Sequence, residues 1–88
     1  MELEGASLES ASLKGLVEFL ARSLSEHPEE VTVTEVEIEG GCIIRLKVAQ
    51  SDLGRVIGKQ GRTAKAIRAL LSASATRLKK RAVLEILE

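Results

Sequence analysis

The sequence predicts a single α+β domain with the element order α-β-β-α-α-β, a three-stranded sheet and helices packed on one face of that sheet. Three observations predict this class. Apolar residues recur at helical spacing near the start, two alternating segments meet at a Gly-Gly pair, and two helical segments divided by a glycine turn precede a last apolar segment. Because 88 residues have room for only one modest core, we expect no second domain.

The first helix is predicted from an apolar stripe that lines one of its faces, formed by Leu13, Leu16, Val17, Leu20 and Leu24. We expect this helix to stop by about Glu26, because Pro28 disfavours the helical conformation at the residue before it. We assign residues 12–88 to the domain and expect residues 1–11 to form a frayed N-terminal segment.

Two strands are predicted next, over residues 31–39 and 42–49, joined by Gly40 and Gly41 as a hairpin. In the second strand the apolar residues share one face, opposite two basic residues; they are Cys42, Ile44, Leu46 and Val48. The first strand changes parity between Val33 and Val36, which predicts either a bulge or a later start of the strand.

The second half of the chain predicts two helices and a strand. A short helix begins at Ser51 or Asp52, either of which can cap it, and ends at Gly58. Gly61 opens a longer helix with an inner face of Ala64, Ile67, Leu70, Leu71, Ser74 and Leu78. Residues 82–87 are apolar on both faces, which predicts a strand inside the sheet.

Composition excludes several kinds of function. No apolar run is long enough to cross a bilayer and the first residues do not resemble a signal peptide, so we expect a cytoplasmic protein without a membrane partner. Cys42 is the only cysteine and His27 the only histidine, too few for a disulfide or a usual zinc site. We expect no metal, no cofactor and no enzymatic activity, because the chain offers no pair of nucleophile and base.

A net charge of zero conceals a strong asymmetry. Residues 1–44 carry ten glutamates against Lys14 and Arg22, a formal charge of −8, whereas residues 45–88 carry a formal charge of +8. This division indicates a surface that meets an anion, although opposite charges that meet across the fold would give the same numbers.

The stretch VIGKQGRTAKAIR, Val56 to Arg68, carries the chemistry that fits an anion. A Gly-x-x-Gly turn that leads into a helix N-terminus makes a shallow cradle for a phosphate. Lys59, Arg62 and Lys65 can neutralise phosphates and Gln60 can hydrogen-bond to phosphate or sugar, while Val56, Ile57 and Ile67 offer aliphatic surface for bases. A purely structural linker with glycine caps remains the alternative.

A P-loop is excluded by the same residues. In GRVIGKQG the spacing from Gly54 to Gly58 is one residue short, and Gln60 stands where a P-loop has Ser or Thr. The segment before the turn is also predicted to be a helix and not a strand.

The string DLGRVIGKQGRTAKAIR, Asp52 to Arg68, resembles the signature of KH domains, and the element order resembles their type II arrangement. The resemblance extends over nearly the whole chain to the small bacterial stand-alone KH proteins of the KhpA type. It implies that single-stranded RNA is bound in a narrow groove. The RNA-binding residues that it implies, together with the basic residues around them, are Val56, Ile57, Gly58, Lys59, Gln60, Gly61, Arg62, Lys65, Ile67, Arg68, Lys79 and Lys80.

In that resemblance Gly58 to Gly61 form the GXXG loop, residues 82–84 form the opposite wall of the groove, and the basic segment 77–81 lies in the variable loop. We expect low sequence specificity and a role as an RNA chaperone or post-transcriptional regulator. The alternative is a protein-interaction module that forms a homodimer or pairs with a KH protein of the KhpB (Jag) type, for which the small residues from Ala69 to Ala75 offer close helix approach.

Overall fold

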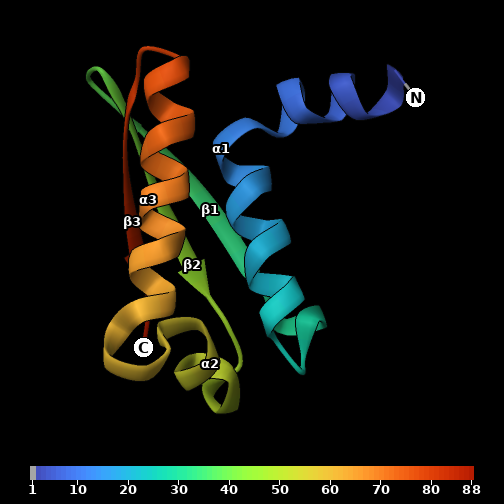
Figure 1. Ribbon diagram of the computed structural model, residues 1–88, viewed down its shortest axis with the longest axis vertical. Helices are drawn as coiled ribbons and strands as arrows, with labels where there is room; N and C mark the ends of the chain where they lie inside the picture. The colour runs from blue at the N-terminus through green and yellow to red at the C-terminus, as the bar shows by residue number, and fades with distance from the viewer. Residues whose placement is uncertain (1) are drawn as a thin grey trace.

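The computed structural model describes the backbone of residues 2–88 and the side chains of residues 13–88. Its helices and strands follow the predicted order (Figure 1): α1 Glu2–Leu24, β1 Thr32–Ile38, β2 Gly41–Lys47, α2 Leu53–Ile57, α3 Arg62–Arg77 and β3 Arg81–Ile86. Single 3₁₀ turns at Pro28–Glu30, Gln50–Asp52 and Lys59–Gly61 connect them. The first helix ends before Glu26, as predicted. The backbone of residues 2–11 belongs to α1, and the expectation that residues 1–11 form a frayed segment stays a prediction.

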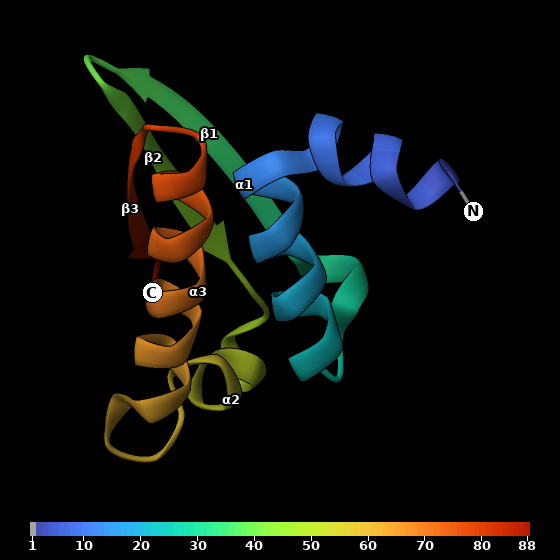
Figure 2. The ribbon, with the colours of Figure 1, turned by 45° about the horizontal axis from the view of Figure 1, so that its top comes forward.

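The sheet has the order β1-β2-β3, with β1 antiparallel and β3 parallel to β2. A parallel pair needs a crossover, and here α2 and α3 form it. The described helices lie on one face of the sheet, which confirms the predicted α+β class (Figures 1 and 2). The expectation that the last strand lies inside the sheet is wrong. β3 is an edge strand whose Leu84 points into the core, whereas Val83 on its other face is 41% exposed.

The hairpin differs from its prediction by one residue. Ile38 pairs with Gly41, so the turn consists of Glu39 and Gly40, and Gly41 is the first residue of β2. The pairing runs without a bulge from Thr32 to Ile38. The parity change has another cause: Glu35 and Glu37 take the helix-side positions of β1 beyond Val33, where the helices no longer cover the strand fully.

A small aliphatic core lies between the helices and the sheet. Its fully buried members include Leu13, Val17, Cys42, Ile44, Leu46, Val56 and Leu71. The four apolar residues that were predicted to share a face of the second strand are all buried, so that prediction is confirmed. Burial, with Glu35 nearby, raises the pKa of the Cys42 thiol.

Three residues that were predicted on the core-facing sides of the helices lie outside the core. Leu24 is 36% exposed, and Leu70 and Leu78 are each 50% exposed. Ala21 and Ala75 are buried instead, because α1 and α3 approach each other and the sheet through small residues. The helical period was predicted correctly, but the buried face of each helix is rotated so that it includes the alanines.

The opposite face of the sheet carries a row of apolar side chains. Val36, Ile43 and Val83 are direct partners across the three strands, and Ile38 extends the row. On the next row Arg45 and Glu85 form an ion pair with 3.0 Å between Nε and Oε1. None of the described helices covers this face.

Candidate nucleic-acid interface

The GKQG turn joins α2 to α3 through three residues with positive φ. Gly58 has φ 78° and ψ 169°, Gln60 has φ 57° and ψ 25°, and Gly61 has φ 74° and ψ 12°. A non-glycine residue in this region costs about 1–2 kcal/mol relative to its ordinary conformation. Gln60 is therefore held in a strained backbone in the middle of the turn, with its side chain exposed to solvent.

The two glycines of the turn are required for different reasons. A Cβ at Gly58 would overlap the side chain of Thr63, so this glycine allows the start of α3 to pack against the end of α2. A Cβ at Gly61 would meet no atom within 4 Å, and only the positive φ favours glycine there. The turn thus has both a structural glycine and one that leaves its outer surface open.

Backbone groups of the turn are partly used within the protein. The Gly61 N–H donates to the Gly58 carbonyl at 3.0 Å, and the Arg62 N–H donates to the Lys59 carbonyl. These two N–H groups are therefore engaged within the turn and are not open to a phosphate. The side chains and the positive end of the α3 dipole remain for that purpose.

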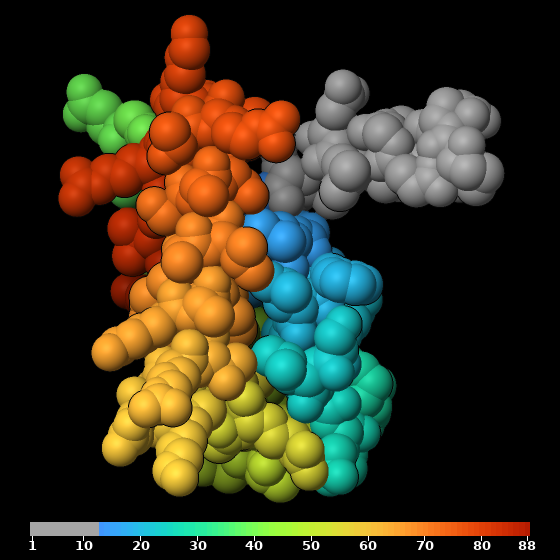
Figure 3. Space-filling view, viewed as in Figure 1, coloured from blue at the N-terminus to red at the C-terminus, as the bar shows by residue number. Residues whose placement is uncertain are grey.

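Basic residues surround the turn without acidic neighbours in the sequence. From Leu53 to Leu84 the chain contains nine Lys and Arg residues and no Asp or Glu. Lys59, Arg62 and Lys65 are exposed, and no carboxylate among residues 13–88 forms an ion pair with them. Figure 3 shows side chains of the GKQG turn and the start of α3, yellow to light orange, that project from one end of the molecule. This end carries a cationic surface.

Arg68 connects α3 to β3, the strand that contains the predicted opposite wall of the groove. It lies on α3, and its Nη2 donates to the carbonyl of Leu84 in β3 at 3.4 Å. Arg68 therefore lies on the side of α3 that faces the edge of the sheet.

Lys79 and Lys80 lie in the turn after α3, at the opposite end of that helix from the GKQG turn (Figure 1). The 16 residues of α3 separate the two sites by about 24 Å at 1.5 Å per residue. Lys79 has φ 58°, and the N–H of Lys80 donates to the carbonyl of Ala75 at 2.9 Å, so this segment also ends α3. The structure does not bring these two lysines together with Lys59.

Two of the three predicted aliphatic contacts are inside the core. Val56 is 0% and Ile67 is 3% exposed, so neither offers surface to a base. Their apolar character serves the packing of α2 and α3 on the sheet. Ile57 is half-buried and is the one that remains at the surface.

Comparison with models of protein families matches residues 14–86 to the family described as "KhpA/KhpB, KH domain". The chain belongs to this family. The match extends from the middle of α1 to the end of β3 and confirms the resemblance that the GKQG segment indicated. KhpA/KhpB KH domains are not enzymes, which confirms that prediction as well.

Several curated proteins are similar to this chain over most of their length. The "RNA-binding protein KhpA" of Clostridium acetobutylicum is 52% identical over 75 residues, which are 85% of this chain and 100% of that protein. The protein of the same name from Aquifex aeolicus is 47% identical over 78 residues, 89% of this chain and 99% of its own length. That of Listeria monocytogenes is 42% identical over 76 residues, with 86% of this chain and 100% of that protein covered.

Among solved structures, a crystal structure of a variant of Aquifex aeolicus Era bound to GDP and AlF4⁻ shares the fold. Its TM-score is 0.61 at 22% sequence identity, over 84% of this chain and 29% of that chain. At this identity the likeness concerns the fold of the KH domain alone.

A residue that the sequence suggested only as a helix cap makes a long-range contact in this KhpA/KhpB domain. Asp52 precedes α2 but makes no cap hydrogen bond to it. Its carboxylate accepts the N–H groups of Glu26 and His27 at 3.1 and 2.9 Å, in the connection after α1. The sequence distance of 25 or 26 residues gives no pattern from which this contact could have been predicted.

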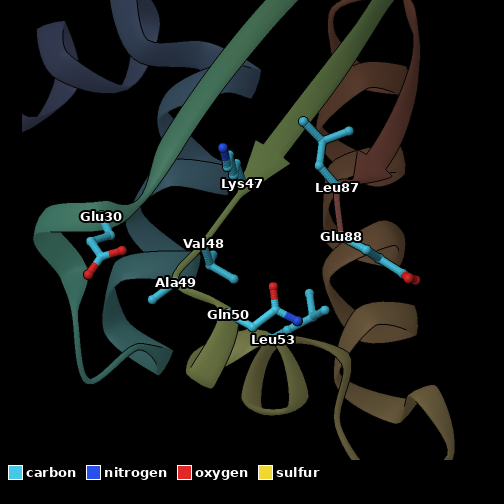
Figure 4. A pocket seen from close by; sticks show the side chains of 8 residues that line it. All are labelled: Glu30, Lys47, Val48, Ala49, Gln50, Leu53, Leu87 and Glu88. Carbon is cyan, nitrogen blue, oxygen red and sulfur yellow. The ribbon is translucent and has the colours of Figure 1, made fainter.

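A cavity of about 230 Å³ lies between the end of the sheet and the start of α2 (Figure 4). Lys47 and Val48 at the end of β2, Leu53 of α2 and Leu87 after β3 are among the residues that line it. No residue of the GKQG turn contributes to the lining, so the cavity is separate from the cationic surface. It leaves the first turn of α2 only partly packed.

No helix in residues 2–88 combines the length and the apolar character that a membrane span needs.

Proposed function

We propose that this chain binds single-stranded RNA through the GKQG loop and the adjoining face of α3. The observation that carries the proposal is the GKQG turn, with Lys59 and Gln60 exposed, within a segment of nine basic and no acidic residues in a domain of the KhpA/KhpB family. Relatives that cover most of the chain are named RNA-binding proteins, which supports the same function.

In this proposal, side chains hold the backbone of the RNA. Lys59, Arg62 and Lys65 each contact a phosphate, and the open outer side of Gly61 lets the sugar-phosphate chain approach closely. The bases turn toward Ile57 and the edge of β3, where Arg68 lies. Lys79 and Lys80, at the far end of α3, contact RNA only if it is long enough to follow the helix.

The proposed binding groove between the GKQG loop, α3 and the edge of β3 has room for few bases, and no aromatic side chain lines it. We therefore expect the protein to discriminate weakly between RNA sequences. We therefore propose that the protein acts in the cytoplasm as an RNA chaperone or post-transcriptional regulator.

The salt dependence of binding tests the proposed phosphate contacts. Three phosphate contacts predict that log K falls with log salt with a slope near −2, taking about −0.7 per phosphate of a single strand. Fluorescence anisotropy of a labelled single-stranded RNA across a salt series measures this slope. A slope near zero, or no binding at low salt, would contradict the proposed function.

The open face of the sheet favours a second function, association with another KH domain. Val83 is 41% and Ile38 is 40% exposed, in a row with Val36 and Ile43 that no described helix covers. We propose that this face packs on a second copy of the chain or on a KH protein of the KhpB (Jag) type. The exposed alanines of α3, which we predicted as a surface for close helix approach, lie on the helix-covered side of the sheet and not on its open face.

For the homodimer, sedimentation equilibrium is expected to show a mass that rises with concentration from 9.5 kDa toward twice that value. Val83→Glu is expected to remove the rise because it places a charge in the apolar row. Phe19→Ser, which alters an exposed apolar residue of α1, is the control and is expected to leave it unchanged. A wild-type protein that stays monomeric would argue against the homodimer.

A further inference from the structure

Asp52 is the one fully buried charged residue among the described side chains. Its relative exposure is 0%, and both carboxylate oxygens accept backbone hydrogen bonds from the connection between α1 and β1. A carboxylate in this environment is costly unless it is well paired. No buried polar side-chain atom in the described residues lacks a partner, so the pairing of Asp52 is complete.

Arg55 extends the same link at the surface. Its Nε lies 3.6 Å from Oδ1 of Asp52, and its Nη2 lies 2.9 Å from Oε2 of Glu26. The residue before α2 and the first turn of that helix are thus both joined to the connection that follows α1. The segment that carries the GKQG turn is attached at this point to a part of the chain far away in sequence.

Helix α2 depends on such attachments because it is very short. It has five residues, and a helix of this length has no stability of its own. Val56 anchors it in the core, and Leu53 is half-buried, because it packs against the core but also borders the cavity of about 230 Å³. Packing alone therefore holds the start of α2 less completely than its end, where Gly58 packs against Thr63.

A tilt of α2 would displace the loop. Gly58 follows Asp52 by six positions, a helical rise of about 9 Å at 1.5 Å per residue. A rotation of about 10° at the start of α2 moves the GKQG turn by about 1.5 Å, whereas a binding site needs placement within about 0.5 Å.

We propose that Asp52 is a positioning residue for the GKQG loop, which it holds at the correct angle to α3 by fastening the start of α2 to the connection after α1. The expected effect on RNA affinity rests on the proposed RNA-binding function. The position of the loop is a property of the free protein. Asp52 is buried and does not itself contact RNA.

The ionisation of Asp52 agrees with this role. Burial by itself would raise its pKa, but the N–H groups of Glu26 and His27, together with His27 and Arg55 nearby, hold the pKa below its ordinary value of 3.8. A carboxyl with a lowered pKa in the folded state stabilises the fold above its ordinary pKa and loses this effect as the pH falls through the lowered value. The link is thus complete at neutral pH.

The test compares Asp52→Asn with wild type and with Ser51→Ala, a change at the exposed neighbour. Amide hydrogen exchange in the free protein is expected to be about fivefold faster or more at Gly58 and Gly61 in Asp52→Asn, with Leu71 in the core of α3 as the internal reference for global stability. RNA affinity is expected to fall by about fivefold while the salt slope stays near −2, because no phosphate contact is removed. Ser51→Ala is expected to match wild type in both measurements.

Unchanged exchange at Gly58 and Gly61 relative to Leu71 would overturn the inference, and so would a fall in affinity accompanied by a shallower salt slope. If wild type itself does not bind RNA, the proposed function fails, and the exchange measurement still decides the role of Asp52. Should Asp52→Asn not fold, Arg55→Gln opens only the surface part of the link. It is then expected to speed exchange at Gly58 and Gly61 about twofold relative to Leu71, and no change would overturn the inference.

Discussion

Replacement of both Lys59 and Gln60 by aspartate is expected to reduce the affinity for single-stranded RNA by at least about tenfold. The double variant removes one cation from the turn and places two anions where the RNA backbone is proposed to lie, so repulsion is added to the loss of a contact. Aspartate accepts a positive φ more readily than most residues, so the strained position of Gln60 tolerates the change. Fluorescence anisotropy at fixed salt measures the loss.

A matched control has the same change of charge away from the turn. Lys14→Asp with Ser23→Asp also replaces one cation and one neutral residue by two anions, here on the exposed surface of α1. If affinity depends on local contact with the GKQG turn, this control keeps most of its binding. Equal losses in the two variants would mean that only net charge matters, and no loss in either would assign the turn a structural role or a protein partner.

Gly41→Ala is expected to destabilise the fold by about 3 kcal/mol or more, because a Cβ at this position would overlap the backbone carbonyl of Arg81. The contact is with the main chain of β3, so no side chain can rotate away to relieve it. The N–H of Arg81 also donates to the carbonyl of Gly40 at 3.0 Å, which fixes the start of β3 against the hairpin. Thermal unfolding followed by circular dichroism is expected to show a Tm lower by more than about 12 °C.

Gly40→Asn is the control for this prediction. Gly40 has φ 79°, and a Cβ at this position would meet no atom within 4 Å. Asparagine accepts positive φ, so the expected cost is below about 1 kcal/mol. A Gly41→Ala variant as stable as Gly40→Asn would show that β3 does not pass as close to Gly41 as the structure indicates.

The sequence predicted best what depends on neighbouring residues. The helical period of α1, the alternation of β2, the end of α2 at Gly58 and the basic turn are local patterns, and each lies where it was expected. The positive φ of Gly58 and Gly61 is what glycine in such a turn adopts readily. A strained Gln60 between them did not follow, because only the surrounding fold forces a non-glycine residue into that conformation.

Features that depend on distant contacts were not predictable in this way. Gly41 was assigned to the turn because glycine is common in turns, whereas its real constraint is the backbone of a strand 40 residues further on. Asp52 was considered, with Ser51, as a cap for α2, although its partners precede it by 25 and 26 residues. Whether Leu70 or Ala75 enters the core depends on how closely α1 and α3 approach, which no single helix reveals.

The parallel pairing of β2 with β3 has a consequence for the time at which the site forms during synthesis. The crossover between these strands consists of α2, the GKQG turn and α3, so all of the loop residues leave the ribosome before β3 does. Pairing between distant segments forms late in folding, and the ribosome adds about 5–20 residues per second. A nascent chain that has not yet reached Ile86 carries the basic loop without the strand that supports Arg68. The loop is therefore expected to become able to bind RNA only after β3 has left the ribosome and paired with β2.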